Sequence, residues 1–282
     1  MKFHQDTSEI FVPDNLPAKD ALARTTHLCV VAHPDDIEMM AAGPILECFQ
    51  RDDKWFTGVV VTDGRGSPRN GKYEKFTDEE MRLVRFREQR KAAIVGEYAA
   101  QMILDYSSEV VKDSRNSAPV SDIAAIIKAA RPQVIFTHNL ADKHETHVAV
   151  AVRVIAALRS LPENARPQKV YGCEVWRDLD WMPDDDKITF DLSEQENLQS
   201  ALLGVYDSQI SGGKRYDLAS LARRRANATF LASHAVDDAT GFSYAMDLTP
   251  LITNLDQDIR EYIQSYVDRF SEEVRKTITR VL

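Results

Sequence analysis

Three short apolar segments, each followed by a polar loop and a helix-patterned stretch, place the strongest constraint on the fold. They are residues 27–32 (HLCVVA), 55–62 (WFTGVVVT) and 132–138 (PQVIFTH). Apolar runs of this length that are rich in Val, Ile and Thr are typical of buried strands. Strands that alternate with helices along a chain predict a mostly parallel sheet covered by helices on both faces.

Helix boundary signals refine this α/β prediction. Thr77 with Glu80, and Ser193 with Glu196, fit the capping box that opens a helix. Pro132 sets the end of the helix expected before the third strand. Further strands are expected at 171–176 and 186–192, and further helices at 39–50, 77–98, 118–131, 147–158, 194–209, 217–234 and 255–282. We therefore expect one α/β domain over 1–282, with a core at about 25–160 and a helical carboxyl-terminal part at about 190–282.

Composition excludes several classes of partner. The 282 residues carry a formal net charge of −9, which argues against a nucleic-acid or anionic-membrane partner. No apolar run approaches the about 18–20 residues that span a bilayer, and the charged amino terminus has no signal-peptide pattern. The three cysteines lie far apart and form no CxxC pair, which is typical of reduced thiols. We expect a cytoplasmic protein, and a homo-oligomer is compatible with the sequence.

Two of the polar loops carry side chains that can bind metal or transfer protons. His33, Asp35 and Asp36 follow the first strand, whereas His144 and His147 follow the third. In open α/β sheets, ligands bind at the carboxyl ends of the strands, so these groups are expected to converge. Two histidines and one carboxylate, with one position left for water, form a common catalytic zinc site. A second carboxylate beside the ligands could then accept the water proton.

These residues resemble a known family. The stretches AHPDDIE (32–38) and RPQVIFTHNLADKHETH (131–147) are similar to motifs of the PIG-L/LmbE-like zinc-dependent N-deacetylases, and the resemblance covers about residues 25–160. It implies a Rossmann-like fold and removal of an acetyl group from an N-acetylated amino sugar or related small molecule. The products would be acetate and a free amine.

The resemblance also implies a role for each of the five loop residues. His33, Asp36 and His147 would bind Zn²⁺, although another divalent ion such as Fe²⁺ would suit the same ligands. Asp35 would act as the general base, and His144 would polarise or protonate the reaction intermediate.

Four further positions concern the substrate. Arg85 matches the arginine of a family RxxEQ helix and would help to hold the substrate. Arg65 stands where the family often has an acid, and Thr146 stands where it usually has Asp. We expect Arg65, Arg69 and Arg85 to make the mouth of the site locally positive, which would suit an anionic group on the substrate.

Other enzyme classes are disfavoured by their missing motifs. Residues 66–72 (GSPRNGK) approach a phosphate-binding loop, but Tyr73 replaces the hydroxyl residue that would hold magnesium. Neither GxGxxG nor GxSxG occurs, which disfavours a dinucleotide-binding protein and a serine hydrolase. The alternatives that remain are a metal- or sugar-binding homologue without turnover, and a metal-dependent amidohydrolase that acts on a non-sugar amide.

Overall fold

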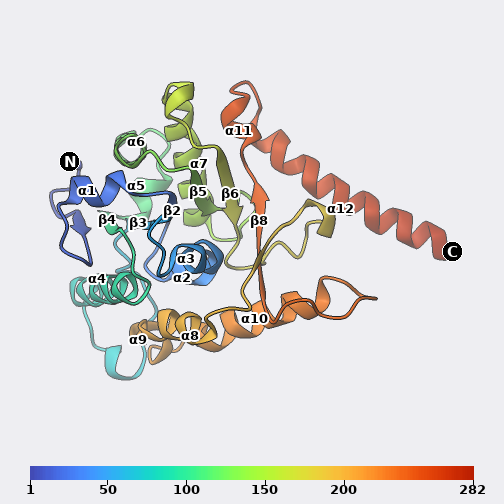
Figure 1. Ribbon diagram of the computed structural model, residues 1–282, viewed down its shortest axis with the longest axis horizontal. Helices are drawn as coiled ribbons and strands as arrows, with labels where there is room; N and C mark the ends of the chain where they lie inside the picture. Colours follow the sequence, from blue (N-terminus) through green and yellow to red (C-terminus); the bar gives the residue numbers. More distant parts are fainter.

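Strand β2 (His27–Val31) lies in the middle of an eight-stranded sheet in the computed structural model, which describes residues 1–282 (Figure 1). The order of the strands is β1-β4-β3-β2-β5-β6-β8-β7. The five strands from β4 to β6 run parallel, and β1, β8 and β7 pair antiparallel with their neighbours. The other strands are β1 (Glu9–Phe11), β3 (Phe56–Thr62), β4 (Ala100–Tyr106), β5 (Val134–His138), β6 (Lys169–Cys173), β7 (Ile188–Asp191) and β8 (Phe242–Asp247). The mostly parallel α/β prediction is confirmed.

Helices cover both faces of this sheet. One face packs against α1 (Ala18–Ala23), α5 (Ser108–Lys112), α6 (Ala118–Ala130) and α7 (Glu145–Ser160). The other packs against α2 (Asp36–Met40), α3 (Ala42–Cys48), α4 (Asp78–Val95) and α8 (Glu196–Gly204). The remaining helices are α9 (Asp207–Ile210), α10 (Tyr216–Phe230), α11 (Pro250–Thr253) and α12 (Ile259–Val281), with 3₁₀ turns η1 (Gly71–Tyr73), η2 (Glu163–Ala165) and η3 (Asp184–Asp186).

The central position of β2 explains its unbroken apolar sequence. Leu28 and Val30 point into the core beneath α6 and α7, and Cys29 and Val31 point into the core beneath α3 and α4. Every residue of β2 is buried. Because both faces of a central parallel strand are covered, its residues do not alternate between apolar and polar.

The connections around β2 create the crevice that holds the site. From β2 the chain adds β3 and then β4 on one side, and it later adds β5 and β6 on the other side. The direction of winding therefore changes between β2 and β5. Ligand sites in such sheets lie outside the carboxyl ends of the strands at this switch point. The loops after β2, β3 and β5 all leave the sheet at this edge.

Three strands are absent from the sequence prediction: the short edge strand β1, and strands β4 and β8. Strand β4 is fully buried, but Gln101 and Asp105 interrupt its apolar pattern. Both side chains find partners, because Gln101 accepts a bond from Gln89 and Asp105 pairs with Arg82. Strand β8 lies within the part expected to be helical and pairs antiparallel with β6. The helix expected at 39–50 is divided into α2 and α3 at Ala41.

The two capping boxes differ in outcome. Thr77 accepts a hydrogen bond from the Glu80 amide while the Glu80 carboxylate accepts one from the Thr77 amide, so the box that opens α4 is confirmed. The box at Ser193 is wrong. The Ser193 hydroxyl donates to Asp191 at the end of β7, and α8 begins after Gln195. The helix before β5 ends at Ala130, as Pro132 predicts.

The three cysteines are all free and buried. No helix combines the length and the apolar character that a bilayer crossing requires.

The two capping-box sequences provide a matched test of local stability. Thr77→Ala should lower the free energy of unfolding by about 1 kcal/mol, because the Glu80 amide at the start of α4 loses its partner. Ser193→Ala should change it by less than about 0.5 kcal/mol, as is usual for exposed positions without a cap. Urea unfolding of both variants checks this. Equal losses would show that Ser193 supports α8 as much as Thr77 supports α4.

Candidate metal and catalytic site

A tight turn after β2 directs Asp35 and Asp36 to different neighbours. The amide of His33 donates to Oδ2 of Asp36 at 2.7 Å, which closes the turn. Asp35 has the left-handed backbone conformation (φ 88°) and forms the amino-terminal boundary of α2. Asp is one of the few side chains that adopt this conformation with modest strain. Both aspartates are buried.

Asp36 forms a triangle of potential metal ligands with two histidines. His33 Nδ1 lies 3.2 Å from Asp36 Oδ2 and 3.2 Å from His147 Nε2. His147 Nε2 lies 3.4 Å from the same oxygen of Asp36. His147 comes from the first turn of α7, which follows β5, so the structure brings together residues that are more than a hundred positions apart.

The dimensions of this triangle fit a divalent ion. Zinc ligands at about 2.0–2.2 Å in tetrahedral geometry are separated from one another by about 3.3–3.6 Å. The three measured separations lie close to that range. Although burial raises the pKa of Asp36, the neighbouring His147 and His138 hold it well below its usual value. Asp36 therefore offers the anionic carboxylate that a metal ligand requires.

His138, which the sequence prediction missed, lies beneath this triangle at the end of β5. Its ring stacks on His147 with 3.9 Å between ring centroids. Its Nε2 accepts the Ala32 amide at 2.8 Å, although it also lies 3.3 Å from Asp36. His138, Asp142 and His147 form a second group with metal-ligand spacing. In the sequence, His138 resembled a core residue, because it lies on a strand within an apolar run.

Asp142 fixes the orientation of His147. Its Oδ2 lies 3.2 Å from Nδ1 of His147, and its Oδ1 accepts the backbone amide of His144 at 2.9 Å. A carboxylate on the second ring nitrogen of a metal-binding histidine sets the tautomer of the ring and raises its basicity. The contact directs Nε2 of His147 toward Asp36 and His33.

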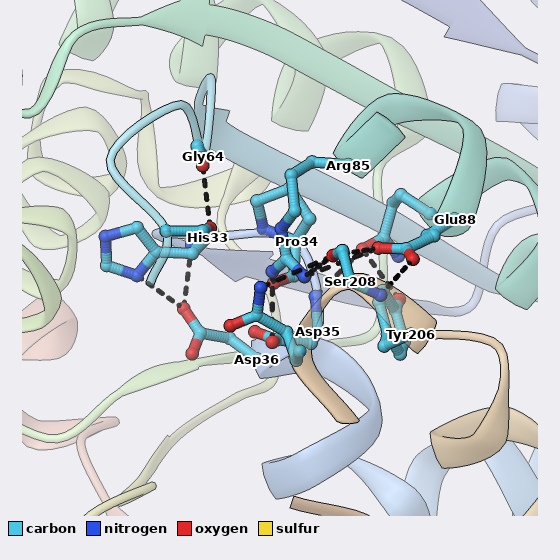
Figure 2. Close-up of polar contacts among 12 residues, drawn as sticks. His33, Pro34, Asp35, Asp36, Gly64, Arg85, Glu88, Tyr206 and Ser208 are labelled. Carbon is cyan, nitrogen blue, oxygen red and sulfur yellow. Dashed lines mark hydrogen bonds and ion pairs between the residues drawn. The ribbon is translucent and has the colours of Figure 1, made fainter. Parts of the chain in front are cut away.

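Asp35 is held on the other side of the turn by α4. Its carboxylate lies 3.0 Å from Nη2 of Arg85, which also donates to the Pro34 carbonyl. The Asp35 amide donates to Oε1 of Gln89 at 3.2 Å. Burial raises the pKa of Asp35 to about 6, and Arg85 opposes this rise. Figure 2 shows Asp36 beside His33 on one side, and Asp35 linked to Arg85 on the other.

The α4 residues that hold Asp35 are themselves held by the chain around α9. Glu88 accepts the amide of Ser208 at 2.7 Å and its hydroxyl at 2.6 Å, and it lies 3.5 Å from Arg85 (Figure 2). The Tyr206 hydroxyl donates to Gln89 at 2.8 Å. The RxxEQ residues thus form one buried hydrogen-bonded layer beneath the aspartate turn.

His144 stands at the start of α7, beside the triangle but outside it. Its ring packs edge-on against His33 at 5.0 Å and stacks on His147 at 4.6 Å. Burial lowers the pKa of His144, and the neighbouring His147 and His33 lower it further. Thr146 is buried and also lines the cleft above.

The cleft that these residues face is polar. It has a volume of about 540 Å³, and only 4 of its 23 lining residues are hydrophobic. Arg65 lines it and is half-exposed, but its Nε donates to Asp63 at 2.7 Å. Arg85 reaches it from a buried position. Trp176 and Tyr216, which no sequence motif marked, bring aromatic surface to the same cleft from the carboxyl-terminal half.

Comparisons with known proteins agree with this geometry. The family model described as PIG-L, GlcNAc-PI de-N-acetylase, matches residues 28–158. No curated protein matches the chain in sequence.

Several solved structures share the fold at low sequence identity. The conserved protein TT1542 from Thermus thermophilus is 18% identical with a TM-score of 0.60, covering 79% of this chain and 94% of that chain. The N,N'-diacetylchitobiose deacetylase from Pyrococcus horikoshii is 17% identical with a TM-score of 0.59, covering 78% and 83%. GalB, the 4-carboxy-2-hydroxymuconate hydratase of Pseudomonas putida KT2440, is 15% identical with a TM-score of 0.58, covering 79% and 96%.

The matched segment contains the ligand triangle, Asp35, the Arg85 helix and His144. Residues 28–158 of this chain are thus similar to the PIG-L (GlcNAc-PI de-N-acetylase) family, and they lie on the α/β fold that the chain shares with these solved structures.

Proposed function

We propose that this protein is a zinc-dependent N-deacetylase that hydrolyses the acetamide of an N-acetylated amino sugar or a related small molecule. One observation carries the proposal: a ligand triangle of zinc dimensions lies beside a buried carboxylate that is held apart from it by an arginine. Amide hydrolysis needs both parts, because water must be activated and its proton must be accepted.

His33, Asp36 and His147 would hold the ion. When bound there, a divalent ion supplies Lewis acidity that acidifies water and polarises a carbonyl group. Asp142 would support this ligand set through His147. The buried anionic Asp36 offsets part of the ion's charge within the protein.

Asp35 is proposed as the general base. Its carboxylate faces the cleft from the same turn as two of the ligands, and its pKa is raised to about 6 by burial. A base whose pKa lies near the working pH accepts a proton and later returns it efficiently. Arg85 would keep the carboxylate in one orientation throughout this transfer.

His144 is proposed to stabilise the oxyanion that develops on the acetyl carbonyl. It lies at the cleft beside His33 and His147 without being part of the triangle. Preorganised donors aimed at developing negative charge make one of the largest contributions to such reactions.

The lining of the cleft suits a hydroxyl-rich substrate. Polar side chains predominate, and Trp176 and Tyr216 offer flat apolar surfaces. Arg65 would contact an anionic or hydroxyl group at the mouth. The family and the diacetylchitobiose deacetylase with the same fold are consistent with an acetylated sugar.

Three other outcomes are distinguished by product and binding measurements on one panel of compounds. Acetate and primary amine are measured on a panel of N-acetylated sugars and non-sugar acetamides, with water addition to an unsaturated carboxylic acid followed in parallel. Amine release from sugars supports the proposal. Release only from non-sugar amides, hydration alone as in the neighbour named a hydratase, or sugar binding without turnover would each replace it.

The metal assignment is tested by two histidine variants. The purified protein should bind about one zinc ion per chain. His33→Ala should lose most of it, because one corner of the triangle disappears, whereas His138→Gln should keep it, because Gln still accepts the Ala32 amide. Metal analysis after dialysis measures both. Zinc loss in His138→Gln with retention in His33→Ala would instead place the ion between His138, Asp142 and His147.

The base assignment is tested by Asp35→Asn, which keeps the shape of the side chain and leaves the triangle untouched. Turnover should fall by about 10²–10⁴, the usual loss of a general base, while zinc content stays at the parental level. Steady-state kinetics and metal analysis on the same preparation provide the two readouts. Loss of zinc together with activity would make Asp35 a ligand or a folding residue.

The two arginines should differ in their kinetic effects. Arg85→Met should lower kcat, because Asp35 loses the partner that orients it, in addition to any effect on substrate binding. Arg65→Met should raise KM with kcat little changed, because Arg65 lies at the mouth of the cleft. If both variants raised KM equally and left kcat unchanged, Arg85 would bind substrate without orienting Asp35.

A further inference from the structure

Helix α12 (Ile259–Val281) leaves the body of the protein and extends into solvent (Figure 1). Its first turns are anchored, since Ile259, Ile263 and Tyr266 pack against the core. Arg269 makes the last ion pair with the body, 2.9 Å from Asp186. Beyond it, the polar contacts of the helix side chains lie within the helix itself.

The projecting part carries an exposed apolar stripe. Its residues are spaced by three, four, four and three positions, which keeps them on one side of a helix: Val267, Phe270, Val274, Ile278 and Val281. Their exposed fractions run from 38% at Val267 to 77% at Val281. The spacing reads the same in both directions from Val274. Two copies of this helix placed antiparallel would therefore present matching apolar side chains at every level.

The charges are arranged oppositely on the two sides of Val274. Residues 267–273 contain three acids and one arginine, a net charge of −2, and residues 275–281 contain three bases and no acid, a net charge of +3. An antiparallel copy would place the acidic half of each helix beside the basic half of the other. A parallel copy would place like charges together, which is unfavourable.

A solitary helix does not account for both features. Acidic residues near the amino terminus and basic residues near the carboxyl terminus stabilise any helix through its dipole. This effect does not explain the apolar stripe. Isolated helices shorter than about 12–15 residues are marginal in water and usually depend on packing of an apolar face. The segment beyond Arg269 has this length and no such packing.

We propose that α12 is a dimer contact whose partner is the α12 helix of a second copy of this chain, antiparallel, with the two-fold axis at Val274. Phe270 then meets Ile278 of the second copy, and Val267 meets its Val281. A single pair of helices buries less than the about 1,200 Å² of standard interfaces, so the dimer dissociates on dilution. The contact is independent of the catalytic site.

The first test compares two Asp substitutions in the same helix. Sedimentation of the full chain at about 100 μM, where a contact with a Kd of ~10 μM is mostly formed, should show a dimer. Val274→Asp places a charge on the axis and should shift the protein to a monomer. Thr279→Asp, on the opposite side of the helix, should leave the dimer in place. Neither residue contacts the body, so both variants should fold.

Disulfide trapping tests the orientation, because the native cysteines are buried. An equal mixture of Val267→Cys and Val281→Cys proteins should cross-link to each other under mild oxidation, whereas Val281→Cys alone should not. Cross-linking of Val281→Cys with itself would show a parallel pair and overturn the proposed arrangement.

Three results would overturn the dimer itself. These are a parental protein that stays monomeric at about 100 μM, a dimer that survives Val274→Asp, or equal dissociation by both Asp variants. A monomer that co-sediments with anionic vesicles would assign the stripe to a lipid surface instead. Since none of these measurements involves turnover, failure here leaves the deacetylase proposal unaffected.

Discussion

Two adjacent carboxylates buried at the end of β2 are the constraint around which the site is built. Burying a charge is costly unless it is paired, and like charges side by side add to that cost. The left-handed backbone at Asp35 relieves the problem by turning the two side chains toward different partners. Asp36 faces His33 and His147, whereas Asp35 faces Arg85. One turn thus separates the proposed metal ligand from the proposed base.

Much of the surrounding structure supplies hydrogen-bond acceptors for the guanidinium of Arg85. Its guanidinium is buried, so it needs acceptors beyond Asp35, and the Pro34 carbonyl and Glu88 provide them. Glu88 is then fixed by Ser208 from the carboxyl-terminal half of the chain. Breaking a buried ion pair leaves an uncompensated charge. This chain of contacts therefore makes the position of Asp35, the proposed base, depend on segments that are far apart in sequence.

The fold by itself does not decide the chemistry. Structures with the same architecture include a protein named as a deacetylase and one named as a hydratase. What distinguishes proteins on a shared scaffold is the arrangement of particular side chains. In this chain the zinc-sized triangle, the separately held Asp35 and the polar cleft together favour metal-assisted hydrolysis.

Local patterns in the sequence determined the α/β class, the buried run of β2, the Thr77 cap and the two loops that carry His33 and His147, because each depends on neighbours a few positions away. Tertiary structure decided the rest. Strand β4 tolerates Gln101 and Asp105 only because distant helix residues pair with them. His138 joins the site, and Arg85 faces Asp35, only because the sheet brings β2, β5 and α4 to one edge. A polar or charged group that is buried without a partner is costly, so these contacts between distant residues matter for stability. No short stretch of sequence contains both partners of such a contact.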